Sequence, residues 1–272
     1  MVEIRKISVV SIVNKGTRFY ITALKSFAYQ TYKNTEWLII DNTGANILKT
    51  KLEKYTQKDE RVKIVSNRTP LDRTRVLEQA FNLATGNYIA FLNPCDFWVA
   101  DKLSRQVGFM MRYKAPMSHT SYAFADDGCH LLPIGCYHIQ KEFNMQNYTL
   151  KNPVSVSTLM LSKDIVVDFS KFSMTDNTDE MMYFLKTGIV SSGMSDVLTL
   201  CRPLFDKQKQ IELENMITSI MRDNPNAANI TSRVLEHHAH SALNVEGLNL
   251  DPMICVGYDV IASLTKLRNF KI

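Results

Sequence analysis

Strand-like and helix-like patterns alternate along the first 113 residues of the chain. Short β-branched or continuously apolar runs predict β-strands at 7–13, 37–40, 61–66 and 88–92. Apolar residues recur at helical spacing after each run, which predicts helices over 17–29, 47–55, 73–83 and 101–113. This succession of strand–helix units predicts an α/β fold with a doubly wound, mostly parallel sheet flanked by helices.

Polar residues follow these predicted strands directly. Asn14 comes after the first strand, Asp41 closes the second, and residues 93–96 follow the fourth. The carboxyl ends of parallel strands meet at one edge of the sheet, and ligands bind outside that edge in such folds. We therefore expect these positions to contribute to a binding site.

Glycines mark the expected ends of two helices. Gly86 follows the helix predicted to end at residue 83, and Gly188 follows a short helix predicted over 179–186. Glycine is the usual residue just past a helix end, because it adopts a left-handed backbone without strain.

The pattern becomes less regular from about residue 114. Short strands are predicted at 121–125 and 157–161, with an irregular stretch rich in Cys, His and Pro between them. A clear amphipathic helix is predicted at 207–222. We find neither an internal repeat nor a linker-like segment, so one domain with a decorated C-terminal half is expected.

Composition indicates a globular, cytoplasmic enzyme. Hydrophobic residues make up 45% of the chain, and 10 Gly and 8 Pro are too few for a collagen-like or low-complexity protein. No run of about 18 apolar residues is present, so no membrane span is expected. No secretory apolar region follows the first residues. Five widely spaced cysteines, an odd number, favour free thiols in a reducing compartment over a disulfide framework.

The charge balance is mildly basic. Lys and Arg number 32 against 27 Asp and Glu, a net charge of +5. A nucleic-acid binder usually concentrates more positive charge, so we expect no nucleic-acid partner. Residues 260–272 mix apolar residues with basic ones. Peripheral contact with an anionic membrane surface and a helix docked on the core both remain open for that segment.

Several short segments together match the spacing of a known family. They are 8–10 (SVV), 30–32 (QTY), 36–41 (EWLIID), 59–63 (DERVK), 84–92 (ATGNYIAFL), Trp98 with 101–103 (DKL), and 152–161 (NPVSVSTLML). In this order they resemble family 2 glycosyltransferases, the inverting nucleotide-sugar enzymes of GT-A fold. The resemblance extends over roughly residues 7–190.

The resemblance implies a domain organisation and an activity. Residues 1–205 would form a GT-A-like catalytic domain, with a nucleotide-binding half (1–113) and an acceptor half (114–205). Residues 206–272 would form a C-terminal helical extension packed on the same domain. The activity implied is transfer of a sugar from a nucleotide-sugar donor to a glycan or lipid-linked acceptor, commonly in surface polysaccharide biosynthesis. A lipid-linked acceptor would place the enzyme at the inner face of the membrane. No oligomeric state is predicted.

The chain departs from the family at the positions that hold the nucleoside. Asn14 stands where relatives place an aromatic residue that stacks on the base, and Asn42 replaces a carboxylate that in relatives accepts from the nucleobase. The resemblance implies donor-binding roles for Asn14, Asp41, Asn42, Arg73, Arg75 and Asn93. The two arginines would face the diphosphate; a solvent-exposed helix face is their alternative.

The segment that holds the metal in relatives is also altered. Its Asp-x-Asp-Asp pattern reads Asn-Pro-Cys-Asp at 93–96, so Cys95 stands at the metal-binding position and only Asp96 survives. Mn²⁺ or Mg²⁺ commonly neutralises a diphosphate leaving group, and these ions prefer oxygen ligands to a thiol. Because Mg²⁺ often binds through one carboxylate plus phosphates and water, we expect a weakened site at Asp96. For Cys95, packing beside the crevice is favoured over a chemical role.

Inverting transfer needs a general base that takes the proton of the acceptor hydroxyl. In relatives the base belongs to an acidic pair at a helix start, and counting back from Gly188 places that pair at Asp176 and Asn177. Asp179 and Glu180 lie close by and would serve if the register shifts. The candidates are therefore Asp179, Asp176 and Glu180. Capping of the helix N-terminus is the alternative role for all three.

Two other interpretations remain open beside the glycosyltransferase. A non-catalytic GT-A scaffold that binds a glycan or a partner protein would account for the joint loss of several carboxylates. A nucleotidyltransferase on a similar sheet is disfavoured, because no Gly-rich nucleotide loop follows the first strand.

Overall fold

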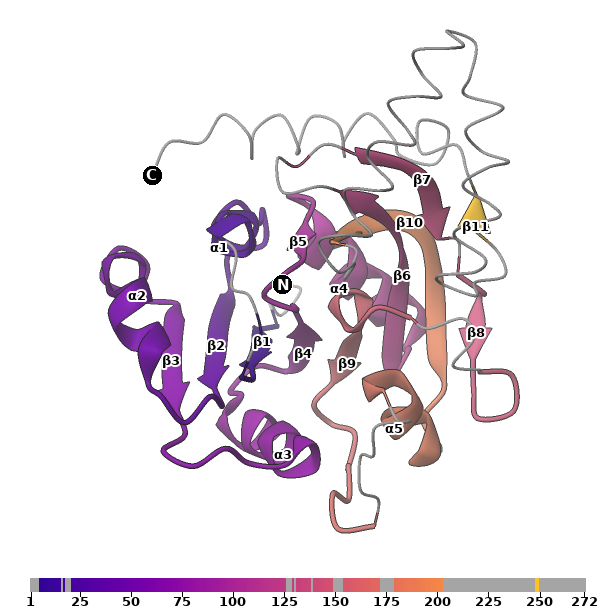
Figure 1. Ribbon diagram of the computed structural model, residues 1–272. Coiled ribbons are helices and arrows are strands. Elements are labelled where there is room, and N and C mark those ends of the chain that lie inside the picture. Colours follow the sequence, from indigo (N-terminus) through magenta and orange to yellow (C-terminus); the bar gives the residue numbers. More distant parts are fainter. Residues whose placement is uncertain are drawn as a thin grey trace, which may run out of the picture.

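A computed structural model gives the architecture of the chain (Figure 1). It describes residues 5–15, 17, 21–125, 129, 131–137, 139–148, 154–171, 179–202 and 248–249. The helix expected at 207–222 and the segment 260–272 lie outside these residues. Of the extension expected over 206–272, only 248–249 belongs to the described part.

The elements predicted for the first half are confirmed. The strands are β1 (Ile7–Val13), β2 (Thr35–Asp41), β3 (Val62–Ser66) and β4 (Tyr88–Phe91). The helices are α1 (Ile21–Ala28), α2 (Ile47–Thr56), α3 (Arg73–Leu83) and α4 (Lys102–Tyr113). β1 pairs in parallel with both β2 and β4, and β2 pairs in parallel with β3. Their carboxyl ends therefore point to the same edge of the sheet.

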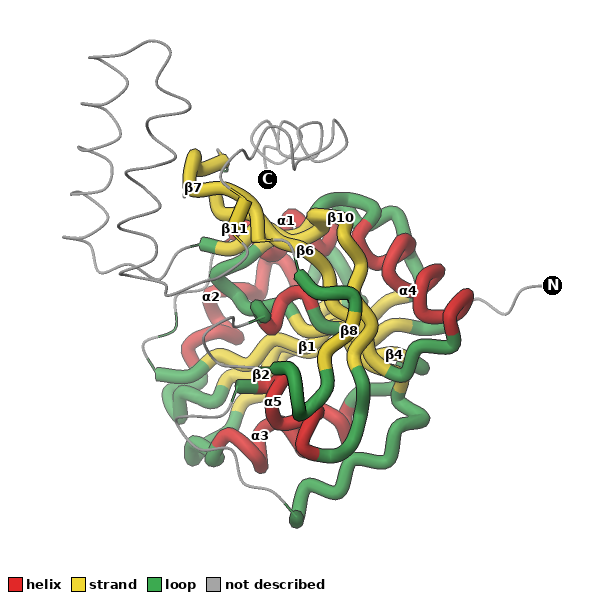
Figure 2. Tube along the Cα trace, turned by 90° about the vertical axis from the view of Figure 1, so that its right-hand side faces the viewer, coloured by secondary structure: helices red, strands yellow, loops and turns green. Residues whose placement is uncertain are grey.

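Helices cover both faces of this parallel sheet, as Figure 2 shows. Val9 and Ile39 point to one face, where they pack with residues of α1, α2 and α4. Val10 and Ile40 point to the other face and pack with residues of α3 and α5 (Glu180–Lys186). Strands buried on both faces are mostly apolar, which explains the hydrophobic runs in β1 and β2.

The second half extends the sheet with mixed pairing. Its strands are β5 (Phe97–Trp98), β6 (Met117–Ala125), β7 (Leu131–Tyr137), β8 (Glu142–Phe143), β9 (Met160–Ser162), β10 (Ser191–Cys201) and β11 (Leu248–Asn249). The strand order is β11-β7-β6-β9-β4-β1-β2-β3, and β10 pairs with β5, β6 and β8. β9 is antiparallel to both β4 and β6, whereas β10 is parallel to β6.

Three expectations for the second half need correction. The strand predicted at 157–161 begins later, because Val156–Thr158 forms a 3₁₀ turn before β9. The stretch expected to be irregular contains β7. β10 was not predicted, because polar residues interrupt its first half and its register against β6 shifts near Val197.

Gly86 is a further correction. The structure ends α3 at the C-cap residue Ala84, and Gly86 does not adopt a left-handed backbone. Gly86 is required for a different reason: a Cβ atom there would lie 2.6 Å from the backbone nitrogen of Ser8. Gly188, with a φ of +88°, does end α5 as expected.

The two glycine environments predict opposite effects of adding a methyl group. Gly86→Ala should lower the melting temperature by several degrees, because strand β1 would have to move away from the new side chain. Gly108→Ala is the control: Gly108 lies in α4 with no atom near its would-be Cβ, and alanine there should stabilise by about 0.5–1 kcal/mol. Equal melting temperatures for the two variants in thermal denaturation would contradict this account.

Candidate active site

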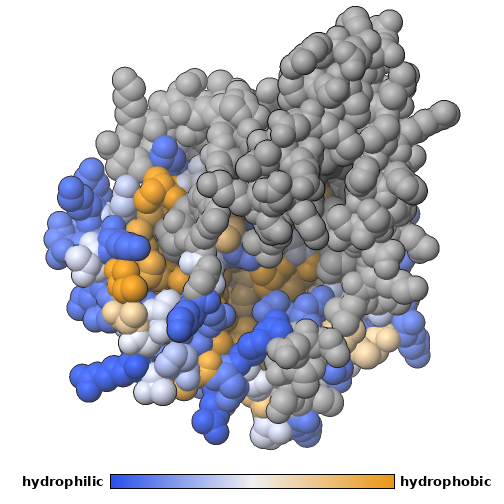
Figure 3. All heavy atoms as spheres, viewed as in Figure 1, coloured by the Kyte–Doolittle hydropathy of each residue, from blue (hydrophilic) through white to orange (hydrophobic). Residues whose placement is uncertain are grey.

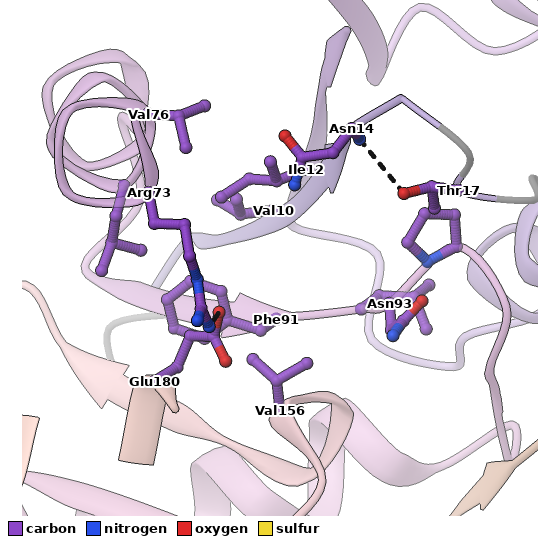
Figure 4. A pocket seen from close by; sticks show the side chains of 13 residues that line it. Val10, Ile12, Asn14, Thr17, Arg73, Val76, Phe91, Asn93, Val156 and Glu180 are labelled. Atoms are coloured by element: carbon purple, nitrogen blue, oxygen red, sulfur yellow. Dashed lines mark hydrogen bonds and ion pairs between the residues drawn. The ribbon is translucent and has the colours of Figure 1, made fainter. Parts of the chain in front are cut away.

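A pocket of about 320 Å³ opens at the carboxyl ends of β1 and β4. Its apolar lining consists of Val10, Ile12, Val76, Leu77, Phe91, Leu92, Pro94 and Val156. Its polar lining consists of Asn14, Thr17, Arg73, Asn93 and Glu180. Figure 4 shows these residues converging from β1, β4, α3 and α5. On the face drawn in Figure 3, hydrophobic residues gather in a hollow near the centre, with hydrophilic residues below it.

The ends of regular elements position the polar lining residues. Asn14 directly follows β1, and Asn93 follows β4 with its backbone N–H donating to the Ser157 hydroxyl at 2.9 Å. Arg73 and Glu180 are the first residues of α3 and α5. These two side chains form an ion pair of 3.5 Å at one side of the pocket. The site thus has both a cation and a carboxylate.

The two sequence candidates Asp179 and Glu180 have different roles. Asp179 caps α5: one carboxylate oxygen accepts from the Met182 backbone N–H at 2.7 Å, and the other accepts from the Tyr148 hydroxyl. Burial raises the pKa of the Asp179 carboxyl, although both hydrogen bonds oppose that shift. Glu180 lines the pocket. Asp176 lies outside the described residues.

Asp41 is buried beside the pocket instead of lining it. One of its carboxylate oxygens accepts from the backbone N–H and the hydroxyl of Thr43, at 3.1 and 2.5 Å. The other oxygen accepts from the backbone N–H of Leu48 at 3.2 Å, in the first turn of α2. The side chain therefore shapes the loop after β2, and its role toward a nucleoside stays a prediction.

Asn42 is the centre of a chain of side-chain amides that runs across the ends of β1, β2 and β3. Its amide nitrogen donates to Asn14 Oδ1 and to the Leu71 carbonyl, both at 2.9 Å. Its amide oxygen accepts from Asn67 Nδ2 at 3.0 Å and from the Leu71 backbone N–H at 2.8 Å. Asn67 and Gln79 then exchange two hydrogen bonds of 2.9 Å. Of these residues, only Asn14 lines the pocket.

Arg75 points away from the pocket. Its side chain is 74% exposed and pairs with Asp72 on the same helix at 3.4 Å. The solvent-exposed alternative therefore describes Arg75, whereas Arg73 lines the pocket.

Asp96 is buried and surrounded by protein donors. One carboxylate oxygen accepts from the Ser157 hydroxyl at 2.5 Å, and the other accepts from the Arg202 backbone N–H at 3.2 Å. Burial raises the pKa of the Asp96 carboxyl to about 6, although donors at Ser157, Arg202 and Cys201 oppose the shift. The Arg202 guanidinium donates to the Cys95 carbonyl and thereby closes this cluster.

These residues do not fit the Mn²⁺ or Mg²⁺ ion expected at Asp96. The carboxylate is 4% exposed and both of its oxygens already accept hydrogen bonds from the protein. Cys95, 7% exposed, offers a soft thiol where a hard ion requires oxygen. Within the described ranges, no three His, Cys, Asp or Glu side chains gather as a metal site.

Sequence reasoning missed two residues that organise the site. Ser157 links Asn93 to Asp96 through its hydroxyl, and Arg202 holds the 95–96 segment from the end of β10. Ser157 lies in the segment 152–161 that carries the resemblance, so the sequence could have indicated its role in the site. Nothing in the sequence distinguishes Arg202 from a surface arginine, because its partners lie more than 100 residues away.

Comparison with solved structures identifies the fold. Residues 1–349 of TarS from S. aureus in complex with UDP-GlcNAc match with a TM-score of 0.57, covering 87% of this chain and 73% of that one at 13% identity. The mannosyltransferase PcManGT from Pyrobaculum calidifontis, solved with GDP-Man and Mn²⁺, matches with a TM-score of 0.53, covering 98% and 76% at 11% identity. The fold is therefore that of GT-A glycosyltransferases.

Sequence comparison then identifies the family. The model of glycosyl transferase family 2 matches residues 10–161, more than half of the 272 residues. The chain belongs to this family, which confirms the resemblance.

Two curated relatives have names that state a reaction or a biosynthetic role. One is the UDP-Glc:α-D-GlcNAc-diphosphoundecaprenol β-1,3-glucosyltransferase WfaP of Escherichia coli, 28% identical over 68% of this chain and 70% of the relative. The other is the putative teichuronic acid biosynthesis glycosyltransferase TuaG of Bacillus subtilis, 27% identical over 62% and 68%. The chain is thus related to enzymes of polysaccharide and teichuronic acid biosynthesis. None of the helices that the structure describes has the length and apolar character to span a bilayer.

The buried carboxyl of Asp96 predicts a pH-dependent stability difference. A pKa raised from 3.8 to about 6 in the folded state means that the native protein loses stability as the pH rises through this window. The loss attributable to this one group is on the order of 3 kcal/mol. Asp96→Asn cannot ionise, so its melting temperature relative to wild type should rise between pH 4 and pH 7. Parallel melting curves for the two proteins across this range would contradict the assignment.

Proposed function

We propose that this chain is an inverting glycosyltransferase that moves a sugar from a nucleotide-sugar donor to a glycan or lipid-linked acceptor in surface polysaccharide biosynthesis. The observation that carries the proposal is the pocket at the carboxyl ends of β1 and β4, into which α3 and α5 bring Arg73 and Glu180. The printed activity of WfaP, which includes a nucleotide-sugar donor and a diphosphoundecaprenol-linked acceptor, supports this substrate class.

Glu180 is the proposed general base. Its carboxylate lines the pocket and has a side chain 26% exposed, so an acceptor hydroxyl can reach it from solvent. Asp179 is less suited to that role, because both of its oxygens hold the start of α5 and the Tyr148 hydroxyl. In the proposed reaction the acceptor hydroxyl gives its proton to Glu180 while its oxygen attacks the anomeric carbon. The nucleoside diphosphate leaves on the opposite face.

Arg73 is proposed to stabilise the leaving diphosphate. A guanidinium binds phosphate oxygens through two N–H groups at once. In the described structure Arg73 pairs with Glu180 at 3.5 Å, so a bound diphosphate would compete for the guanidinium and release the carboxylate toward the acceptor. Asn93 lines the same pocket and is a further donor-binding candidate.

A nucleotide panel tests the proposal. The panel contains UDP, GDP, CMP and dTDP, each with and without Mn²⁺. The nucleotide that fits the pocket should raise the melting temperature of the protein by several degrees. Saturation near 100 Kd corresponds to about 2.7 kcal/mol. If no nucleotide raises the melting temperature in either condition, the protein is instead the non-catalytic scaffold. The neutral Asn42 and the buried Asp96 favour that alternative.

Two neighbouring substitutions distinguish the base from the cap. Glu180→Gln should lower kcat by roughly 10²- to 10⁴-fold, because it removes the proton acceptor. Asp179→Asn is the matched control: asparagine caps helices as well as aspartate, so kcat should change little. Turnover of the donor nucleotide found in the panel, measured with both variants, decides between them. A larger loss for Asp179→Asn would transfer the role to Asp179.

A further inference from the structure

The orientation of the Asn42 amide is determined by backbone groups. The Leu71 N–H can only donate and the Leu71 carbonyl can only accept, and these groups contact Oδ1 and Nδ2 of Asn42 at 2.8 and 2.9 Å. Reversing the amide would place oxygen against oxygen and N–H against N–H. With its bonds to Asn14 and Asn67, the 3% exposed Asn42 makes all four hydrogen bonds that an amide side chain can make.

This orientation determines which atom Asn14 presents to the pocket. Because Nδ2 of Asn42 donates to Asn14, the atom of Asn14 that faces Asn42 must be its oxygen. The amide nitrogen of Asn14 is therefore directed away from Asn42, and Figure 4 shows it over Val10 and Ile12 inside the pocket. Among the residues that the structure describes, this end of the pocket presents a neutral N–H donor and no carboxylate.

The surroundings of Asn14 suit an uncharged ring. Val10, Ile12 and Val76 line the pocket near Asn14, whereas Arg73 and Glu180 lie apart from it in Figure 4. A diphosphate is stabilised near a guanidinium, and a flat, neutral heterocycle is stabilised between apolar walls with one polar contact that fixes its orientation.

We propose that Asn14 selects the donor nucleotide by donating a hydrogen bond to a carbonyl oxygen of its nucleobase, with Asn42 as the positioning residue that holds the N–H in place. This inference rests on the proposed transferase function. In relatives, a carboxylate at the position of Asn42 accepts a hydrogen bond from the base. Here that carboxylate is absent, and the protein instead donates a hydrogen bond to the base. The ligand class is a nucleoside diphosphate whose base carries a ring carbonyl, which excludes adenine.

Two substitutions at Asn14 test the contact. Asn14→Asp keeps the acceptor for Asn42 and loses the donor, and Asn14→Ala loses the donor without adding charge. Both should weaken binding of UDP, GDP or dTDP, whichever binds wild type, by about tenfold in calorimetry. ADP has the same ribose diphosphate but no base carbonyl, so its weaker affinity, measured by competition, should stay unchanged in Asn14→Ala.

The pattern of losses separates the possible failures. If Asn14→Asp alone weakens binding, charge repulsion is the cause and the proposed contact is wrong. If ADP and the preferred nucleotide lose affinity equally in Asn14→Ala, Asn14 contacts the ribose or phosphates and the proposal is overturned. A wild-type protein that binds none of the nucleotides overturns the proposed function itself, which is a different result.

Asn42→Asp tests the positioning role. A carboxylate at position 42 can only accept, so the Asn14 amide should turn its nitrogen toward that carboxylate and present its oxygen to the pocket. Nucleotide affinity should fall about tenfold or more, as in Asn14→Ala, and the unliganded protein should melt earlier, because the Leu71 carbonyl loses its donor. Tighter nucleotide binding by Asn42→Asp would show that position 42 contacts the base directly, and would overturn the proposal. If this variant does not fold, the Asn14 variants still decide.

Discussion

The parallel pairing of β1 with β2 on one side and β4 on the other is the constraint on which the site depends. Because both faces of these strands are covered by helices, their register is held by buried side chains along their whole length. Their carboxyl ends consequently meet at one edge, where Asn14, Asn42 and Asn93 follow β1, β2 and β4. The close approach of Gly86 to Ser8 belongs to the same constraint, since it allows the chain to enter β4 directly beside β1.

The polar groups at this edge are satisfied mainly by the protein itself. Asn42 makes four hydrogen bonds within the amide chain, and Asp96 accepts from a serine hydroxyl and a backbone N–H below the surface. Burial of polar atoms requires such partners, because an unpaired group would cost about 1–3 kcal/mol. In the described part of the chain, the charged side chains that line the pocket are therefore Arg73 and Glu180, at the starts of two helices. A site of this kind depends on amide donors and on one ion pair, where the resemblance led us to expect a row of carboxylates.

The first half of the fold was predictable from local pattern, and the second half was not. α3 and β1 have the bounds that the hydrophobic pattern indicates, because α3 buries one regular face and β1 is buried along nearly its whole length. β10 begins with a mostly polar stretch that contains Asp196. Its pairing with β6 joins segments about 75 residues apart, as in Ser191 with Met117. Strands of this kind are stabilised by non-local partners that no local window contains. Arg202 was missed for the same reason, since it acts on Cys95 and Asp96 from a distant part of the chain.

The sequence by itself determined the family, the order of the first four strand–helix units, and the presence of Asp179 and Glu180 at a helix start. It also determined that positions 14 and 42 carry neutral amides. Only the tertiary structure decided which of two adjacent acids caps α5 and which lines the pocket. Successive residues of a helix point about 100° apart, so neighbouring side chains face different parts of the protein. Likewise, only the tertiary structure decided which end of the Asn14 amide faces the ligand. That choice depends on the backbone of Leu71, which fixes the orientation of the Asn42 amide. Asn14, Asn42 and Leu71 come together only when the ends of β1 and β2 and the segment before α3 pack at one edge of the sheet.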